Sequence, residues 1–182
     1  MNMQIAYSNT RYSGTNDGFT LIELIAVMTI TAILAVVSIP ALNSMGQTRA
    51  AGAAVDLQRS MTFARQNAVS TGTRTWVVFN VGGNSWSVLK EDPLAPGRAG
   101  ASLITDPASG QDFIATLNSD ETVGVSLVSA TFDAGSEIGF DWLGRPLNAS
   151  ENDLAAAGTV TLTGNHQVTV EVDTGHIRYV AP

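Results

Sequence analysis

Cysteine is absent from the 182-residue sequence, histidine occurs only twice, and charged residues make up 14% of the chain. Without cysteine there is no disulfide framework, no cysteine-ligated zinc site and no thiol catalysis. Two histidines are too few for a multi-histidine metal centre. Basic residues are also scarce, nine against sixteen acidic ones, and the formal net charge is −7. Since a dedicated nucleic-acid-binding protein is normally basic, this composition argues against one and leaves few routes to an enzyme.

Sequence motifs for catalysis or metal binding are lacking too. No nucleophile motif such as G-x-S-x-G occurs. His166, in a predicted Gly-Asn-His turn, and His176 lie in no metal-ligand spacing. Four loop carboxylates are of the residue type that binds calcium, but their spacing fits no EF-hand loop and indicates a solvated loop: Asp106, Asp112, Asp120 and Glu121. We therefore predict no enzymatic activity, no metal and no cofactor.

The hydrophobic residues are concentrated near the N-terminus. Residues 19–39 read FTLIELIAVMTITAILAVVSI and contain one charge, Glu23, and no glycine or proline. At ~1.5 Å per residue this run makes about 30 Å of helix, enough to cross a bilayer core. The polar segment before it carries only two charges, Arg11 and Asp17. A secretory signal peptide has a basic start and a cleavage site after its apolar region, so this run is predicted to remain as an anchor.

Glu23 is the unusual residue of this run. A carboxylate in the lipid interior costs on the order of 2.5–3.5 kcal/mol unless it is paired or neutralised. Two interpretations stay open from the residues alone. Either Glu23 reaches the headgroups from near the end of the span, or it meets a positive group inside an assembly. Cleavage of the chain after Gly18 would create such a group, the α-amine of Phe19.

The segment Gly18-Phe19-Thr20-Leu21-Ile22-Glu23-Leu24 resembles the processing signature of type IV pilins and type II secretion pseudopilins. In that family a membrane-embedded prepilin peptidase cuts after the glycine and N-methylates the new terminal phenylalanine. The glutamate then neutralises the terminal amine of a neighbouring subunit as the helices assemble into a filament. The resemblance therefore assigns cleavage to Gly18 and Phe19, N-methylation to Phe19, and assembly to Glu23.

The same resemblance sets the predicted organisation of the chain. Pro40 matches the family's helix-bending proline, and a proline does remove one helical hydrogen bond. Asp17 departs from the family, which commonly has a basic residue there. The predicted parts are a leader at 1–18, a transmembrane and assembly helix at 19–40, the amphipathic half of that helix at 41–72, and a periplasmic β-rich domain at 73–182.

Periodicity predicts an α+β fold, which the resemblance makes pilin-like. Small and apolar residues recur every three or four positions, as on one face of a helix: Ala54, Leu57, Met61, Ala64 and Ala68. One long N-terminal helix is thus predicted from 19 to about 70, with its second half packed on an antiparallel β-sheet. Strands are predicted at 74–81, 85–90, 113–117, 123–129, 137–142, 158–163, 168–173 and 176–180, the first two as a hairpin and the last three as a meander. The three tryptophans are predicted to be core or sheet-face residues: Trp76, Trp86 and Trp142.

Four segments are similar to H-type minor pseudopilins and the related FimT-like pilins, the GspH/FimT-like family: 57–68, the Trp76/Trp86 hairpin, 140–146 and 175–178. The resemblance implies a minor pseudopilin of a type II secretion system, at or near the tip of the periplasmic pseudopilus, that aids protein export across the outer membrane. It also implies a single-pass bacterial inner-membrane protein with its C-terminal domain in the periplasm. The implied partners are the prepilin peptidase, other major and minor pseudopilins, the inner-membrane assembly platform and secreted proteins.

The alternative is a FimT-like minor pilin of a type IV pilus, involved in pilus biogenesis or DNA uptake. The corresponding family motif is Gly-Arg-x-Arg, whereas residues 175–178 read Gly-His-Ile-Arg, with a histidine that is mostly neutral at pH 7. The candidate DNA contacts are Arg178, His176 and Arg145. Residues 73–182 carry five basic and thirteen acidic residues, and such a surface repels phosphate. Nucleic acid is therefore not the expected partner.

Overall fold

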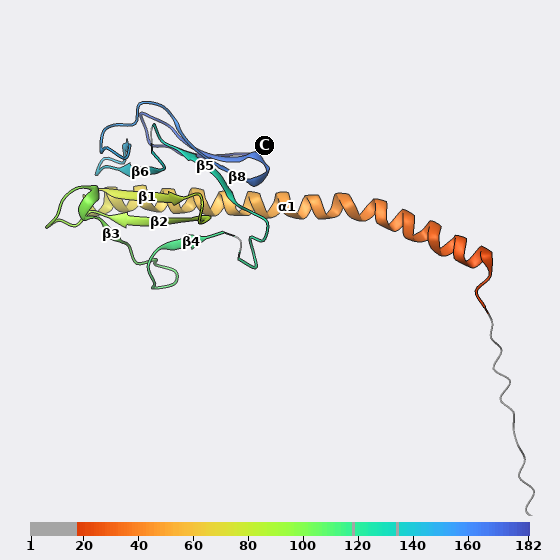
Figure 1. Ribbon diagram of the computed structural model, residues 1–182. Helices are drawn as coiled ribbons and strands as arrows, with labels where there is room; N and C mark the ends of the chain where they lie inside the picture. The colour runs from red at the N-terminus through yellow and green to blue at the C-terminus, as the bar shows by residue number, and fades with distance from the viewer. Residues whose placement is uncertain (1–17, 118, 134) are drawn as a thin grey trace, which may run out of the picture. The chain divides into compact units, whose positions relative to one another are not determined.

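The computed structural model describes residues 18–117, 119–133 and 135–182, apart from the side chains of residues 37–44 (Figure 1). Residues 1–17, which make up almost all of the predicted leader, lie outside the described residues. The side chain of Pro40 is not described either. The chain divides into two compact units, 1–41 and 42–182. The helix α1 (Leu21–Thr71) contributes residues to both, and each unit is described by itself.

Within residues 42–182, α1 supplies one side of the hydrophobic core. Its buried face consists largely of alanines, which allow strands to approach the helix closely. The fully buried positions are Ala50, Ala53, Ala54, Leu57, Met61, Ala64 and Ala68. This list contains the whole predicted stripe, so the predicted packing face of the helix is confirmed.

The first sheet is built around the predicted hairpin. Its strands are β1 (Thr75–Asn80), β2 (Ser85–Lys90), β3 (Ser102–Leu103), β4 (Ile114–Thr116), β6 (Glu137–Phe140) and β7 (Pro146–Leu147). The order is β3-β2-β1-β6-β7, and β4 pairs with β2 beside β3. All of these pairs are antiparallel, with Phe79 opposite Trp86 in the hairpin. The two-residue strands β3 and β7 were not predicted.

The second sheet contains the predicted C-terminal meander. Its order is β10-β9-β8-β5, formed by β5 (Leu127–Thr131), β8 (Gly158–Leu162), β9 (His166–Val170) and β10 (Ile177–Val180). The prediction of one sheet is therefore wrong for the described residues, which form two. Two predicted strands are also displaced. β5 begins at Leu127 and not at residue 123, and β9 begins at His166 and not at residue 168. Short 3₁₀ turns lie at η1 (Arg98–Gly100) and η2 (Thr163–Asn165).

Both sheets bury apolar residues in one core with α1. The side-chain amide of Gln58 on α1 donates to the carbonyl of Ile177 on β10, which fixes the second sheet to the helix. Trp76 and Trp86 are buried as predicted, whereas Trp142 is 57% exposed and lies after the end of β6, so its assignment to the core or to a sheet face is wrong. The α+β prediction with a long N-terminal helix is confirmed.

Candidate functional site

The N-terminal motif lies at the start of α1. Gly18, Phe19 and Thr20 precede the helix, which begins at Leu21. The Thr20 hydroxyl accepts a hydrogen bond from the backbone N–H of Glu23 at 3.3 Å. Threonine is a preferred N-cap, and its spacing to Glu23 is that of a capping box. Glu23 thus lies in the first helical turn, where the helix dipole favours a negative charge.

The peptide bond predicted to be cleaved, between Gly18 and Phe19, is accessible to solvent in the described structure. Gly18 and Phe19 are both exposed, Phe19 by 81%. A Cβ atom added at Gly18 would have no heavy atom within 4 Å. This bond therefore lies in accessible, non-helical backbone directly before a capped helix.

Every described side chain from residue 19 to residue 36 is exposed. The large apolar ones lie on all sides of the helix: Phe19, Leu21, Ile22, Leu24, Ile25, Val27, Met28, Ile30, Ile33, Leu34 and Val36. A helix that is apolar all round is typically buried in a membrane or within a larger protein core. In the part of the chain that the structure describes, no helix has the combination of length and apolar character needed to span a membrane.

The candidate DNA contacts lie on exposed positions of the β-rich domain, and both arginines are paired with carboxylates. The Arg178 guanidinium is 3.4 Å from Glu171 Oε1. The Arg145 guanidinium is 2.8 Å from Asp141 Oδ2 and 3.8 Å from Asp153 Oδ2. The hydrogen bond to Asp141 and the neighbouring carboxylate charges raise the pKa of Arg145.

His176, the third candidate DNA contact, is exposed in the connection that leads into β10. No ion pair is found for it among the described residues. Since the charges of Arg145 and Arg178 are offset by carboxylates, the three candidates do not add up to a strongly positive surface.

His166 differs from its predicted place in a turn. It is the first residue of β9, it is 4% exposed, and both ring nitrogens have hydrogen-bond partners. Nδ1 bonds to the hydroxyl of Tyr179, and Nε2 lies 3.0 Å from Gln47 Oε1. His166 therefore links β9 to β10 and to α1. Across residues 18–117, 119–133 and 135–182, no three histidine or carboxylate side chains gather to form a metal site.

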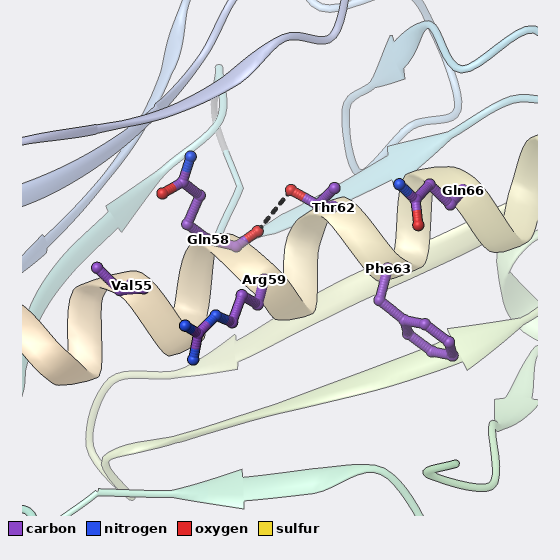
Figure 2. Close-up of a pocket in the computed structure, with 6 residues that line it drawn as sticks. All are labelled: Val55, Gln58, Arg59, Thr62, Phe63 and Gln66. Carbon is purple, nitrogen blue, oxygen red and sulfur yellow. Dashed lines mark hydrogen bonds between the residues drawn. The ribbon is translucent and has the colours of Figure 1, made fainter. Parts of the chain in front are cut away.

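A hollow of about 410 Å³ follows the outer surface of α1. Figure 2 shows its lining residues: Val55, Gln58, Arg59, Thr62, Phe63 and Gln66. Phe63 stacks on Phe113, with ring centroids 5.4 Å apart, and Arg59 pairs with Asp56 at 2.8 Å. The lining contains no carboxylate, histidine or paired nucleophile, so the hollow does not bring together groups for acid–base or nucleophilic catalysis. Sequence periodicity did not indicate it.

A capped, apolar N-terminal helix whose second part packs against antiparallel sheets defines the class of pilin-like subunits. Residues 15–39 match the prokaryotic N-terminal methylation motif, and residues 53–175 match the type II transport protein GspH. The second match covers more than half of the chain. The chain therefore belongs to the family of the type II transport protein GspH.

Two solved structures of the minor pseudopilin EpsH from the type 2 secretion system of Vibrio cholerae have the same fold. They are 13% identical to this chain, with TM-scores of 0.54 and 0.55. The alignments cover 74% and 75% of this chain and 96% of each EpsH chain. A search of curated proteins gives no match.

These findings confirm the predicted resemblance and the pilin-like α+β fold. The chain is a type II transport protein of the GspH family, and it shares its fold with the minor pseudopilin EpsH. The FimT-like alternative is not favoured.

Proposed function

We propose that this chain is a structural subunit at or near the tip of the periplasmic pseudopilus, where it aids protein export across the outer membrane. The proposal rests on one observation: a GspH domain at 53–175 follows a helix whose apolar side chains from 19 to 36 are all uncovered. Helices of neighbouring pseudopilins provide an apolar cover of matching length. Burial of such side chains stabilises an assembly by roughly 25 cal/mol per Å².

We further propose that the prepilin peptidase removes residues 1–18 and that the new N-terminal amine, on Phe19, is methylated. Residues 19–40 then act as the membrane and assembly helix, 41–72 as its amphipathic continuation, and 73–182 as the periplasmic domain. In the filament, Glu23 of one subunit pairs with the Phe19 amine of a neighbour. Pairing removes most of the cost of burying either charge alone.

The proposed location is the bacterial inner membrane, crossed once, followed by incorporation into the pseudopilus. The proposed partners are the prepilin peptidase, major and minor pseudopilins, the inner-membrane assembly platform and secreted proteins. Nucleic acid is not among the proposed partners, because the domain is acidic and because Arg145 and Arg178 are paired with carboxylates.

The test is the extracellular proteome of a clean deletion strain, compared with the strain complemented by the full-length gene. Secreted proteins are expected to accumulate in the periplasm of the deletion strain and to return to the medium on complementation. Complementation with Leu94→Ala, at a 94% exposed loop position, is the matched control and should restore export. An unchanged extracellular proteome in the deletion strain overturns the proposal.

A further inference from the structure

The turn between β6 and β7 presents large apolar side chains to solvent. Trp142 is 57% exposed and Leu143 is 54% exposed. Val69, near the end of α1, is also exposed and adjoins the turn, because a Cβ atom at Gly144 would lie 3.2 Å from Val69 Cγ2. Figure 1 shows β6 beside the last turns of α1. We call Val69, Trp142 and Leu143 the turn patch.

The backbone of this turn is held firmly from inside the domain. The buried Asp141 carboxylate accepts hydrogen bonds from the backbone N–H groups of Leu143 at 2.9 Å and Arg145 at 2.8 Å. Gly144 has a φ of +80°, which suits glycine, and its carbonyl accepts a hydrogen bond from Arg65 Nε at 2.9 Å. An apolar surface that is already ordered loses little entropy on binding. The turn patch is therefore preorganised for contact.

A hollow of about 230 Å³ lies beside the turn. Its lining is Arg145, Pro146, Asp153, Leu154, Val172 and Asp173. Arg145 is engaged with Asp141 and Asp153, whereas Asp173 has no ion pair among the described residues. The lining thus holds one guanidinium and two carboxylates, and the Arg145 charge is already offset by Asp141, so the hollow is negative. The hollow borders the turn because two of its lining residues, Arg145 and Pro146, directly follow Gly144 in the chain.

We propose that the turn patch and this hollow form a docking surface for a protein segment that carries a lysine or arginine beside an apolar side chain. The apolar side chain covers Trp142 and Leu143, and the basic group enters the hollow toward Asp173. Charge complementarity identifies the occupant, because the hollow and the whole domain are acidic. The same charge disfavours an anionic membrane surface or nucleic acid. The inference rests on the proposed function, in which the chain contacts other proteins.

The first test is site-specific photocrosslinking in the host with the full-length chain. A photoreactive amino acid replaces Leu143 in one strain and Leu94, the exposed loop control, in another. The crosslinked partner peptide is expected to contain a lysine or arginine within a few residues of the attachment point. Introducing Asp173→Lys should lower the Leu143 crosslink yield about tenfold, while Asp173→Asn lowers it less.

Three results overturn the docking surface: equal yields at the two positions, partner peptides without basic residues, or a yield that Asp173→Lys does not change. Export separates this inference from the function on which it rests. The double variant Trp142→Ala/Leu143→Ala should keep its thermal midpoint, since both side chains are exposed, and should reduce export. If deletion blocks export but the double variant exports normally, the docking surface is overturned and the proposed function stands. If deletion has no effect, the proposed function fails.

Discussion

The hydroxyl of Thr20 caps the helix that contains Glu23 by accepting a hydrogen bond from the Glu23 backbone N–H. The carbonyl oxygen of Thr20 also accepts from the N–H groups of Glu23 and Leu24, each at 3.1 Å. Unpaired N–H groups are more costly in apolar surroundings than in water. The cap therefore fixes the backbone that carries the proposed assembly carboxylate.

We predict that Thr20→Ala loosens the first turn of α1. Loss of a threonine N-cap costs about 1 kcal/mol, which corresponds to a roughly fivefold larger equilibrium population of the open first turn and so to roughly fivefold faster amide exchange. The measurement is backbone amide exchange at Glu23 and Leu24 in the full chain in detergent micelles. Thr20→Ser keeps the hydroxyl and should exchange like the parent chain. Equal exchange in Thr20→Ala and the parent contradicts the capping role.

We predict that Glu23→Ala leaves leader removal intact and impairs assembly. The substitution leaves Gly18 and Phe19 unchanged, so the peptidase site is preserved, but the neighbour's Phe19 amine loses its partner and remains a buried charge. Mass spectrometry of the mature N-terminus reports cleavage, and the amount of chain in sheared pseudopili reports assembly. Glu23→Asp, which keeps the charge, is the control. Normal incorporation of Glu23→Ala into pseudopili would contradict the assembly role.

Local patterns were sufficient to predict the helix face and the hairpin. The spacing of Leu57, Met61 and Ala64 follows from the helical period, and the glycine turn at 82–84 lies between two alternating runs, so neither depends on distant contacts. The N-terminal methylation motif could also be recognised from the sequence, because its residues are contiguous.

The division into two sheets and the burial of His166 could not be predicted in this way. His166 is buried because Tyr179 and Gln47, 13 and 119 positions away, meet its ring. Trp142 is exposed because Asp141 anchors the turn from within. The burial of His166 depends on tertiary contacts, whereas the exposure of Trp142 follows from a local turn around Asp141, and each overrides the residue's general preference for turn or core.

Gly158→Ala should destabilise the domain strongly. An added Cβ atom would lie 2.2 Å from Cδ1 of Phe132, a fully buried ring stacked on Phe79 with centroids 5.6 Å apart. Overpacking of this kind costs about 1–3 kcal/mol. Urea denaturation measures the loss. Gly52→Ala is the matched control, since nothing lies within 4 Å of its Cβ position, and it should raise stability by up to about 1 kcal/mol. A Gly158→Ala domain as stable as the parent contradicts the packing.

Asp133 should contribute to acid sensitivity. Hydrogen bonds from the Asn148 side chain and then from the backbone N–H groups of Ala155 and Ala156 lower its pKa from the usual 3.8. Because the folded-state pKa is the lower one, this stabilisation is complete above pH 3.8 and is lost as the pH falls through the folded-state value. Asp133→Asn should therefore reduce the drop in the urea midpoint between pH 7 and pH 2.5.

The control for this acid effect is Asp173→Asn, which removes an exposed carboxylate that makes no ion pair among the described residues. Asparagine also tolerates the φ of +52° at position 133, so the backbone need not change. A drop in the midpoint that is the same in Asp133→Asn and in the parent chain contradicts the role of these hydrogen bonds.

Arg65 should hold two loops to the end of α1. Its Nε donates to the Gly144 carbonyl at 2.9 Å and its Nη2 donates to the Thr174 carbonyl at 3.0 Å. Arg65→Met removes both bonds and should cost about 1–2 kcal/mol. Arg65→Lys is the control, and because an ammonium lacks the planar fork of guanidinium, it should recover only part of the loss.

Two measurements test the role of Arg65: amide exchange across the full chain, and urea denaturation. Exchange should accelerate at Gly144 and Gly175, near the two acceptor carbonyls, while Val88 in the β1–β2 hairpin keeps its protection. This local pattern separates loosened loops from general destabilisation, which accelerates all three amides together. If Arg65→Met leaves Gly144 and Gly175 as protected as in the parent chain, Arg65 does not order the turn that carries Trp142 and Leu143.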